Sequence, residues 1–467
     1  MRFDVLDKSP DAAYHTKQGN EVLPRALPET AFADDFCNLC CGAIFFYARS
    51  PERMSVMLLS LSLLLSLGWV LGALAKKIGL PPLCGMLACG VLLGPFALDL
   101  LSPELLALSP VLRRVALLII LMRAGLGLDL DALRRASRPA LLMCFVPACF
   151  EMLGVILLAP RLLHVSTLDA ALIGAALAAV SPAVVVPRML RLDAEGYGTA
   201  RGIPQLIMAG ASVDDVFVIV AFTSFTAMAQ GGAVSAAAIV RAPVSIVLGI
   251  MLGIACGYGA ARLLRAPSLS PAARAMLLLA LCFALVALED ALTGPVAVSG
   301  LLAIMTAGAV LRRRDGVLAA QLSGAFEALW VPAELLLFSL VGATVDVRYA
   351  ALAGAASIAV VLGALLFRAV GVLLCLTGTA LHARERLFCV FAYLPKATVQ
   401  AAIGGIPLAL GLPCGNAVLT AAVLAILITA PLGALLIDRS YQMLLSPVSV
   451  CDIMEPSFDV DERGEVL

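Results

Sequence analysis

Apolar segments of about 20 residues recur along this chain, each long enough for a helix to cross a hydrocarbon core of roughly 30 Å. They run from Met54 to Ile437 with short polar breaks between them. Within lipid every backbone polar group must be satisfied inside the protein, and these continuous apolar runs lack the alternation of β-barrel strands. The sequence therefore predicts an all-α polytopic membrane protein.

The composition agrees with this class, since 62% of the residues are apolar and 14% are charged, against roughly 45–50% and 25% in an ordinary soluble domain. The formal net charge is zero, so we expect membrane lipids and no nucleic acid as partners. The thirteen cysteines lie mostly in apolar segments, as small packing residues. The cluster "CNLCC" at 37–41 has no second Cys/His pair nearby, which favours membrane-edge packing or lipidation over a metal site.

The apolar pattern predicts about thirteen spans, with ends placed to within about 2–4 residues. They cover roughly residues 54–75, 80–98, 109–128, 139–159, 166–187, 203–229, 238–260, 273–290, 294–311, 325–345, 350–377, 387–410 and 414–437. Loops after odd-numbered spans carry sixteen Lys and Arg residues, and the other loops and edges carry five. By the positive-inside rule the N-terminus lies outside and the C-terminus in the cytoplasm, in a plasma or inner cell membrane.

Three parts follow along the chain. Residues 1–53 are a polar tail without a signal-peptide layout, in which residues 31–48 can form a short extra helix at the membrane or on its surface. Residues 54–437 form the transmembrane domain. Residues 438–467 form an acidic cytoplasmic tail.

Two spans are interrupted by proline. The fifth contains "SPAVVVP" with Pro182 and Pro187, and the twelfth contains "LPKATVQAAIGG" with Pro395. Proline removes a backbone hydrogen bond, and irregular backbone at membrane depth is tolerated where it faces protein or a water-filled cavity. The two spans are seven apart, an odd offset, so spans 4–6 and 11–13 are inverted repeats. Paired broken helices of this kind indicate a transporter with its binding site near the midplane.

Few charges lie inside the spans, and each costs roughly 2.5–3.5 kcal/mol at mid-bilayer unless it has a partner or a function. Glu151 on span 4 and Arg368 on span 11 occupy corresponding repeat positions. This predicts a buried ion pair that serves either as scaffolding or in coupling and gating. The other charges within the spans or near their ends are Arg123, Asp214, Asp215, Glu289, Asp290, Glu327, Glu334 and Lys396.

Asp214 and Asp215 are adjacent carboxylates near the middle of span 6. Neighbouring helix positions point about 100° apart, so the two side chains have different surroundings and tasks. With freed backbone carbonyls and the Ser212 hydroxyl they supply the oxygen ligands that Na⁺ or Li⁺ requires. Burial beside a like charge also favours proton uptake near neutral pH. Proton and cation then compete for one site, which is the chemistry of an antiporter.

The remaining charges have less definite roles. Lys396 either neutralises the negative ends of the half-helices or pairs with an aspartate until a cation displaces it. Arg123 either snorkels to the surface or lies on the cation path, and Glu334 has no partner that the sequence identifies. No Walker, ABC or HExxH motif is present, so we expect an ion gradient as driving force, no enzyme activity and no cofactor.

Several motifs resemble the NHA-type branch of the monovalent cation:proton antiporter superfamily, within the sodium/hydrogen exchanger family. They are "RAGLGLD" (123–129), "SPAVVVPRML" (181–190), "GYGTARGIPQLIMAGASVDDV" (196–216), "LPKATVQAAIG" (394–404) and "LITAPLGALLI" (427–437). The resemblance spans about Met54 to Ile437. It implies the sodium/proton antiporter fold, with core helices at about 109–229 and 325–437 and a dimerisation domain at about 54–98 and 238–311, usually in a homodimer.

The resemblance also implies roles for individual residues. Asp215 is the direct carrier of Na⁺ or Li⁺ and of the proton, and Asp214 is the supporting carboxylate. Glu151 and Arg368 match a buried acidic and basic pair, and Lys396 matches the lysine of the second broken helix. The first crossover matches Pro182, Ala183, Val184 and Val185, of which Val184 and Val185 are candidate cation ligands together with Ser212.

The implied function is exchange of Na⁺ or Li⁺ for protons in pH homeostasis, by elevator-like movement of the core. Arg368 stands where electrogenic relatives often carry lysine, so the stoichiometry is not carried over. The added N-terminal helix of mammalian members has only residues 31–48 as a counterpart. The alternatives are a sodium-coupled symporter of an organic anion on the same fold and a gated cation channel.

Overall fold

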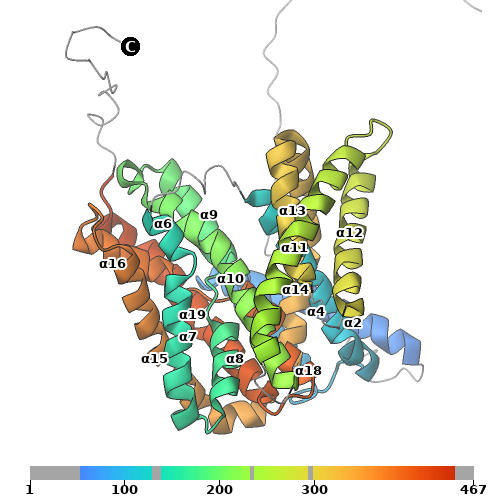
Figure 1. Ribbon diagram of the computed structural model, residues 1–467. Helices are drawn as coiled ribbons and strands as arrows, with labels where there is room; N and C mark the ends of the chain where they lie inside the picture. Colours follow the sequence, from blue (N-terminus) through green and yellow to red (C-terminus); the bar gives the residue numbers. More distant parts are fainter. Residues whose placement is uncertain (1–52, 129–137, 232–235, 293–297, 448–467) are drawn as a thin grey trace, which may run out of the picture. The chain divides into compact units, whose positions relative to one another are not determined.

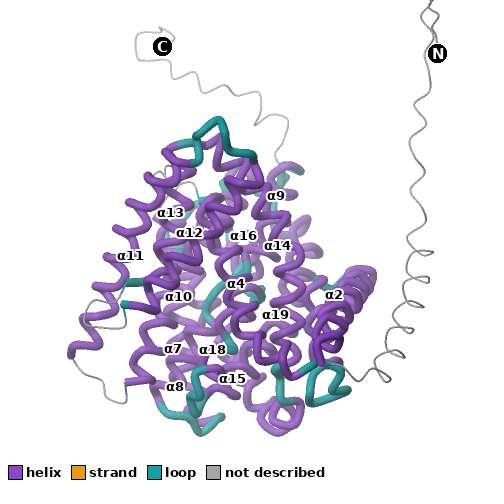
Figure 2. Tube along the Cα trace, turned by 90° about the vertical axis from the view of Figure 1, so that its right-hand side faces the viewer, coloured by secondary structure: helices purple, strands orange, loops and turns teal. Residues whose placement is uncertain are grey.

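The computed structural model describes residues 53–128, 138–231, 236–292 and 298–447, all within a unit that begins at Arg49. The polar N-terminal tail with its expected extra helix at 31–48, and the tail beyond residue 447, lie outside these ranges. The described chain forms helices and no strand (Figure 2), apart from an isolated bridge between Tyr197 and Pro447. The predicted all-α class is confirmed.

Nine helical segments of the described chain are long and apolar enough to cross a membrane. Helices lie at every one of the predicted span positions, but four of these positions hold shorter or less apolar helices. The count of thirteen spans therefore stays a prediction. The last helix runs to Leu444, beyond the predicted end of its span at residue 437.

One group of helices packs together on the right of Figure 1. It consists of α2 (Arg53–Lys77), α3 (Pro82–Leu93), α4 (Pro103–Gly127), α11 (Ala236–Leu263), α12 (Pro271–Ala291), α13 (Gly300–Arg314) and α14 (Gly316–Ala343). Helix α14 packs against α3 and α4, and α13 packs against α4 and α11. We refer to these helices as the first group.

The second group lies mainly on the left of Figure 1, although α18 is seen further right, below α14. It consists of α6 (Arg138–Met143), α7 (Val146–Leu162), α8 (Thr167–Leu177), α9 (Pro182–Ala194), the short 3-10 helix η1 (Thr199–Arg201), α10 (Ile203–Gly231), α15 (Val347–Cys375), α16 (Ala383–Ala392), α17 (Thr398–Ile403), α18 (Ile406–Ala409) and α19 (Gly415–Leu444). Its most extensive contact joins α7 to α15. Helix α10 packs on α8 and α9, and α19 packs on α15 and α16.

The second group contains the segments predicted as spans 4–6 and 11–13, the two inverted repeats. Helices α4 and α14 were expected with them as core helices. They pack mainly within the first group, on each other, with α4 also on α13 and α14 also on α3. The two groups meet where α10 contacts α11 and where α17 contacts α4 and α14. The division into a core and a dimerisation domain stays a prediction.

Both predicted interruptions are present. Helix α8 ends at Leu177 and α9 begins at Pro182, while α16 ends at Ala392 and α17 begins at Thr398. Pro182 occupies the first position of α9, where a backbone N–H has no intrahelical partner in any case. Pro187 lies inside α9 without ending it. A break between α6 and α7 was not predicted from the sequence.

Short polar side chains begin several helices. The N-cap serines of α4, α8, α12 and α13 each accept a hydrogen bond from a backbone N–H three residues on. At the start of α14, outside the spans, Asp315 accepts from the Leu318 N–H at 3.0 Å and from Arg265 at 2.8 Å. These hydrogen bonds hold the pKa of Asp315 below its usual range.

The contact between α3 and α14 depends on two glycines. A Cβ atom on Gly90 would collide with the carbonyl oxygen of Ser339, and one on Gly342 would collide with the carbonyl oxygen of Leu87. Because the colliding atoms belong to the backbone, they cannot be moved by a change of rotamer. A side chain at either position would force the two helices apart.

We expect Gly342→Ala to lower the free energy of unfolding by about 1–3 kcal/mol, the usual cost of overpacking. The control is Gly324→Ala on the same helix, where open space surrounds the position and alanine is the better helix former. Thermal denaturation in detergent compares the two variants with the unaltered protein. An unchanged melting temperature for Gly342→Ala would contradict the close approach of α3 and α14.

Candidate functional site

The two broken helices meet at their gaps. The Ser181 N–H donates to the Pro395 carbonyl at 2.8 Å, which joins the stretch after α8 to the stretch after α16. Helices α8 and α16 both end here, with Ala178 and Tyr393 as their C-cap residues. Helix C-termini carry partial negative charge and carbonyls without intrahelical donors, so this crossing calls for a buried cation.

Arg368 of α15 is that cation, and only 1% of its surface is exposed. Its Nε donates to the Tyr393 carbonyl at 2.7 Å, and its Nη1 donates to the Ala178 carbonyl. One guanidinium therefore binds the C-caps of both half-helices, for which its planar fork of donors is well suited. The sequence pointed to Lys396 for this position, but Arg368 occupies it.

The ion pair of Glu151 and Arg368 predicted from the sequence is present, with 2.6 Å between Arg368 Nη1 and Glu151 Oε2. Arg368 Nη2 also lies 3.0 Å from Asp214 Oδ2. Lys396 Nζ lies 2.5 Å from Glu151 Oε2, and its backbone N–H donates to Thr429 Oγ1 at 2.9 Å. Lys396 thus has a glutamate, and not an aspartate, as its ionic partner.

We call Glu151, Asp214, Arg368 and Lys396 the buried charge network. Each of them is at most 2% exposed. Buried charges are tolerated when they are paired and hydrogen-bonded, and here two carboxylates face two cations. The network is therefore neutral before Asp215 is counted.

Asp214 and Asp215 differ in their surroundings, as their positions on a helix require. Asp214 is 0% exposed, and its Oδ2 accepts from the Val180 N–H at 2.8 Å and from Arg368 at 3.0 Å. Asp215 is 7% exposed and forms no ion pair with any residue that the structure describes, and its buried Oδ1 has no hydrogen-bond partner among them. A buried carboxylate without a partner is costly, so Asp215 has reason to bind a proton or a cation.

The first crossover begins earlier than the sequence indicated. Its non-helical residues are 178–181, and the expected residues Val184 and Val185 lie in the first turn of α9, because Pro182 starts that helix instead of interrupting it. The Val184 carbonyl accepts from Arg188 Nη1 at 2.9 Å. Ser212 lies on α10 with the aspartates, but its side chain is outside the described part of the structure.

A residue that sequence reasoning did not single out also binds this crossover. Gln400 of α17 is fully buried, and its Nε2 donates to the carbonyls of Leu177 at 3.1 Å and Ala179 at 2.9 Å. It thus provides donors for carbonyls that lie where the helix is interrupted. The available signal was an amide inside an apolar half-helix, since a buried amide must find hydrogen-bond partners.

The remaining charges that the sequence singled out lie in the first group: Arg123 on α4, Glu289 and Asp290 on α12, and Glu327 and Glu334 on α14. Arg123 of α4 forms an ion pair with Glu327 of α14, and both are charged neighbours of Glu334. Arg114 forms an ion pair with Asp290 at 2.8 Å. These pairs do not include any member of the buried charge network.

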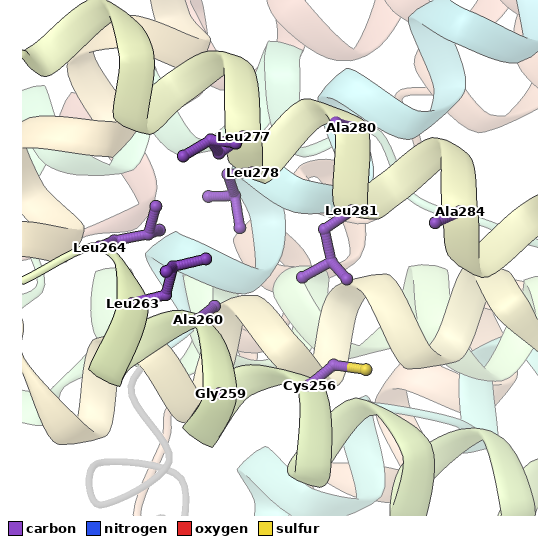
Figure 3. Close-up of a pocket in the computed structure, with 10 residues that line it drawn as sticks. All are labelled: Cys256, Gly259, Ala260, Leu263, Leu264, Leu277, Leu278, Ala280, Leu281 and Ala284. Atoms are coloured by element: carbon purple, nitrogen blue, oxygen red, sulfur yellow. The ribbon is translucent and has the colours of Figure 1, made fainter. Parts of the chain in front are cut away.

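A cavity of about 530 Å³ lies between α11 and α12 (Figure 3). Its lining residues are Cys256, Gly259, Ala260, Leu263, Leu264, Leu277, Leu278, Ala280, Leu281 and Ala284. None of these side chains is charged, so the cavity has no carboxylate for a cation and is separate from the site at the crossing.

Comparison with known proteins gives consistent results. The model of the family described as sodium/hydrogen exchanger, transmembrane, matches residues 61–438. Sodium/hydrogen exchanger 9B2 of Mus musculus is 34% identical over 77% of this chain and 67% of its own length. The Homo sapiens protein of that name is 32% identical over 83% of this chain and 73% of its own length. The sodium proton antiporter MjNhaP1 from Methanocaldococcus jannaschii has a similar fold, with a TM-score of 0.74 at 19% identity, covering 84% of this chain and 99% of that one.

The helical fold and the two broken helices define a class, the multi-pass helical membrane proteins with a fold like that of MjNhaP1. The match of the family model to residues 61–438 is more specific than the likeness of the fold. The chain belongs to the sodium/hydrogen exchanger family. Members of this family are transporters.

We expect Arg368→Lys to lower the free energy of unfolding by about 3–5 kcal/mol, the usual cost of breaking a buried pair. A lysine ammonium is a point donor and cannot reach two carboxylates and two C-cap carbonyls together. The control is Arg265→Lys in the exposed pair with Asp315, where the loss is expected to stay below about 1 kcal/mol. Equal melting temperatures of the two variants in detergent would show that Arg368 does not hold the crossing.

Proposed function

We propose that this protein exchanges Na⁺ or Li⁺ for protons at Asp215, with Asp214 as a supporting carboxylate. The observation that carries the proposal is that Asp215, which has no ion-pair partner among the residues that the structure describes, lies beside a charge network that is already neutral. One proton or one monovalent cation neutralises this remaining charge, so the two exclude each other. The site then crosses the membrane with one or the other bound.

A bound cation would take oxygen ligands, as hard cations do. Asp214 Oδ1, Asp215 Oδ1 and Ser181 Oγ are buried and have no hydrogen-bond partner among the described residues. Ser212 remains a proposed ligand because it lies on α10 with both aspartates. The carbonyl of Val184 is a weaker candidate, because it already accepts from Arg188.

The packing supports an elevator-like mechanism. The site lies wholly in the second group, whose main contacts with the first are those of α10 with α11 and of α17 with α4 and α14. In this proposal the second group moves as a body and carries the site across the membrane. The helices at about 54–98 and 238–311 would serve as the dimerisation domain of a homodimer in the cell membrane, with the N-terminus outside and a role in pH homeostasis.

In liposomes with an imposed pH gradient, addition of NaCl or LiCl is expected to dissipate the gradient, and Asp215→Asn is expected to abolish this effect. An amide cannot alternate between a protonated and a cation-bound charged form. Asp214→Asn is expected to slow exchange without abolishing it, because asparagine can still accept from the Val180 N–H. The proposal would fail if Asp215→Asn exchanged at the rate of the unaltered protein.

The charge balance also predicts one-for-one exchange. If Arg368 and Lys396 stay charged through the cycle, each Na⁺ replaces one proton and no net charge crosses the membrane. Exchange rates measured at clamped membrane potentials are then expected to be equal at positive, zero and negative potential. A rate that changes steeply with potential would contradict a single titrating carboxylate.

The same preparation tests the other candidate functions. Sodium-dependent uptake of an organic anion would favour a symporter, although the acidic site repels anions. Single-channel currents, far above the turnover of a carrier, would favour a channel.

A further inference from the structure

We propose that Gln400 is a positioning residue for Asp214, which acts through the backbone peptide between Ala179 and Val180. This inference rests on the proposed function, because it concerns how the same site discriminates a proton from a cation. It gives a role in ion binding to a residue that touches neither carboxylate.

The Ala179–Val180 peptide is held from both sides. Gln400 Nε2 donates to the Ala179 carbonyl at 2.9 Å, and the Val180 N–H donates to Asp214 Oδ2 at 2.8 Å. The carbonyl and the N–H of a trans peptide point in opposite directions within one plane. Gln400 and Asp214 therefore lie on opposite sides of a single planar unit, and each contacts one end of its dipole.

Neighbouring hydrogen bonds prevent this plane from rotating. The same Nε2 donates to the Leu177 carbonyl at 3.1 Å, and Arg368 donates to the Ala178 carbonyl between them. Three consecutive carbonyls thus have donors from two other elements, α17 and α15. Hydrogen bonds at the two ends of one amide also polarise and strengthen each other in a low-dielectric interior.

The Gln400 side chain is better explained by its donors than by its volume. It is fully buried, and its Oε1 has no hydrogen-bond partner among the described residues. An unsatisfied buried oxygen costs free energy that an apolar side chain of the same size would avoid. The amide is therefore useful for the two bonds that its nitrogen donates to the first crossover.

The effect of Gln400 on Asp214 depends on which protonation state of the carboxylate the Val180 N–H stabilises. A hydrogen bond donated to a carboxylate favours its charged form over its protonated form. Without Gln400 the peptide can tilt, the bond to Asp214 weakens, and protons compete better with Na⁺ at the aspartate pair. Gln400 thus favours the cation over the proton.

Other charged and titratable groups around Asp214 are unchanged by a substitution at Gln400. They are Asp215 on the same helix, Arg368 on α15, Lys396 and Tyr393 at the second crossover, Cys144 between α6 and α7, and Cys149 on α7. A change in the pH dependence of exchange can therefore be assigned to the peptide.

The test replaces Gln400 with methionine, which is similar in size and has no donor. In liposomes the curve of exchange against pH is expected to move by about 0.5–1 pH unit to more alkaline values, and the apparent KM for Na⁺ at fixed pH is expected to rise about three- to tenfold. Gln400→Glu, of the same shape but with an added negative charge, is expected to shift the curve further in the same direction.

The matched control is Ser339→Ala in the first group, which removes a partly buried hydrogen bond that Ser339 Oγ donates to the Met86 carbonyl at 3.1 Å. It is expected to lower the melting temperature and to leave the pH curve and the KM unchanged. If Gln400→Met does not fold, Gln400→Asn replaces it, because the shorter amide retreats from both carbonyls.

Two failures can be distinguished. If the unaltered protein shows no Na⁺-dependent proton movement, the proposed function itself is wrong. If the unaltered protein exchanges normally and the folded Gln400 variants keep its pH curve and KM, the positioning role is wrong. A lower melting temperature with an unchanged pH curve would show that Gln400 only packs, and would overturn the inference.

Discussion

The binding of two half-helix ends by one guanidinium is the interaction on which the rest of this site depends. Carbonyls at a helix C-terminus are tolerable in water, but at membrane depth each needs a donor. Arg368 bonds to the C-cap carbonyls of α8 and α16 and to the carboxylates of Glu151 and Asp214. Because arginine keeps its charge at any physiological pH, the crossing stays assembled while a neighbouring group gains or loses a proton.

Charge pairing also explains how two adjacent aspartates differ in their surroundings. Asp214 accepts from Arg368 and from the Val180 N–H, so its charge is compensated inside the protein. Asp215, one position further along α10, has no such compensation among the described residues. The low dielectric that makes an unpaired carboxylate costly also makes a proton or a small cation a strongly bound partner. In the proposed mechanism, exchange depends on this one carboxylate, whose charge the buried charge network does not balance.

The sequence predicted those features that depend on one residue in an unusual setting. Charges inside apolar spans identified Glu151, Arg368 and the aspartate pair, and prolines located both broken helices. It could not show which cation lies at the helix ends, because position in the sequence alone does not distinguish Arg368 from Lys396. It placed the first crossover at residues 182–185 and not 178–181, because proline both interrupts helices and begins them. It missed Gln400, whose partners are backbone carbonyls more than 200 positions away.

The first crossover is built from atoms that every amino acid possesses. Ala178 and Ala179 contribute carbonyl oxygens and Val180 contributes an amide hydrogen, while their own side chains take no part in the hydrogen bonding described. Alanine scanning would therefore pass over this stretch without detecting what it does. The role of this stretch can be tested by chemical replacement of an amide bond. An ester in place of the Val180 amide, for example, removes the N–H that donates to Asp214. Part of the proposed ion site is thus formed by backbone atoms. Ordinary mutation cannot remove these atoms and can change only the side chains around them.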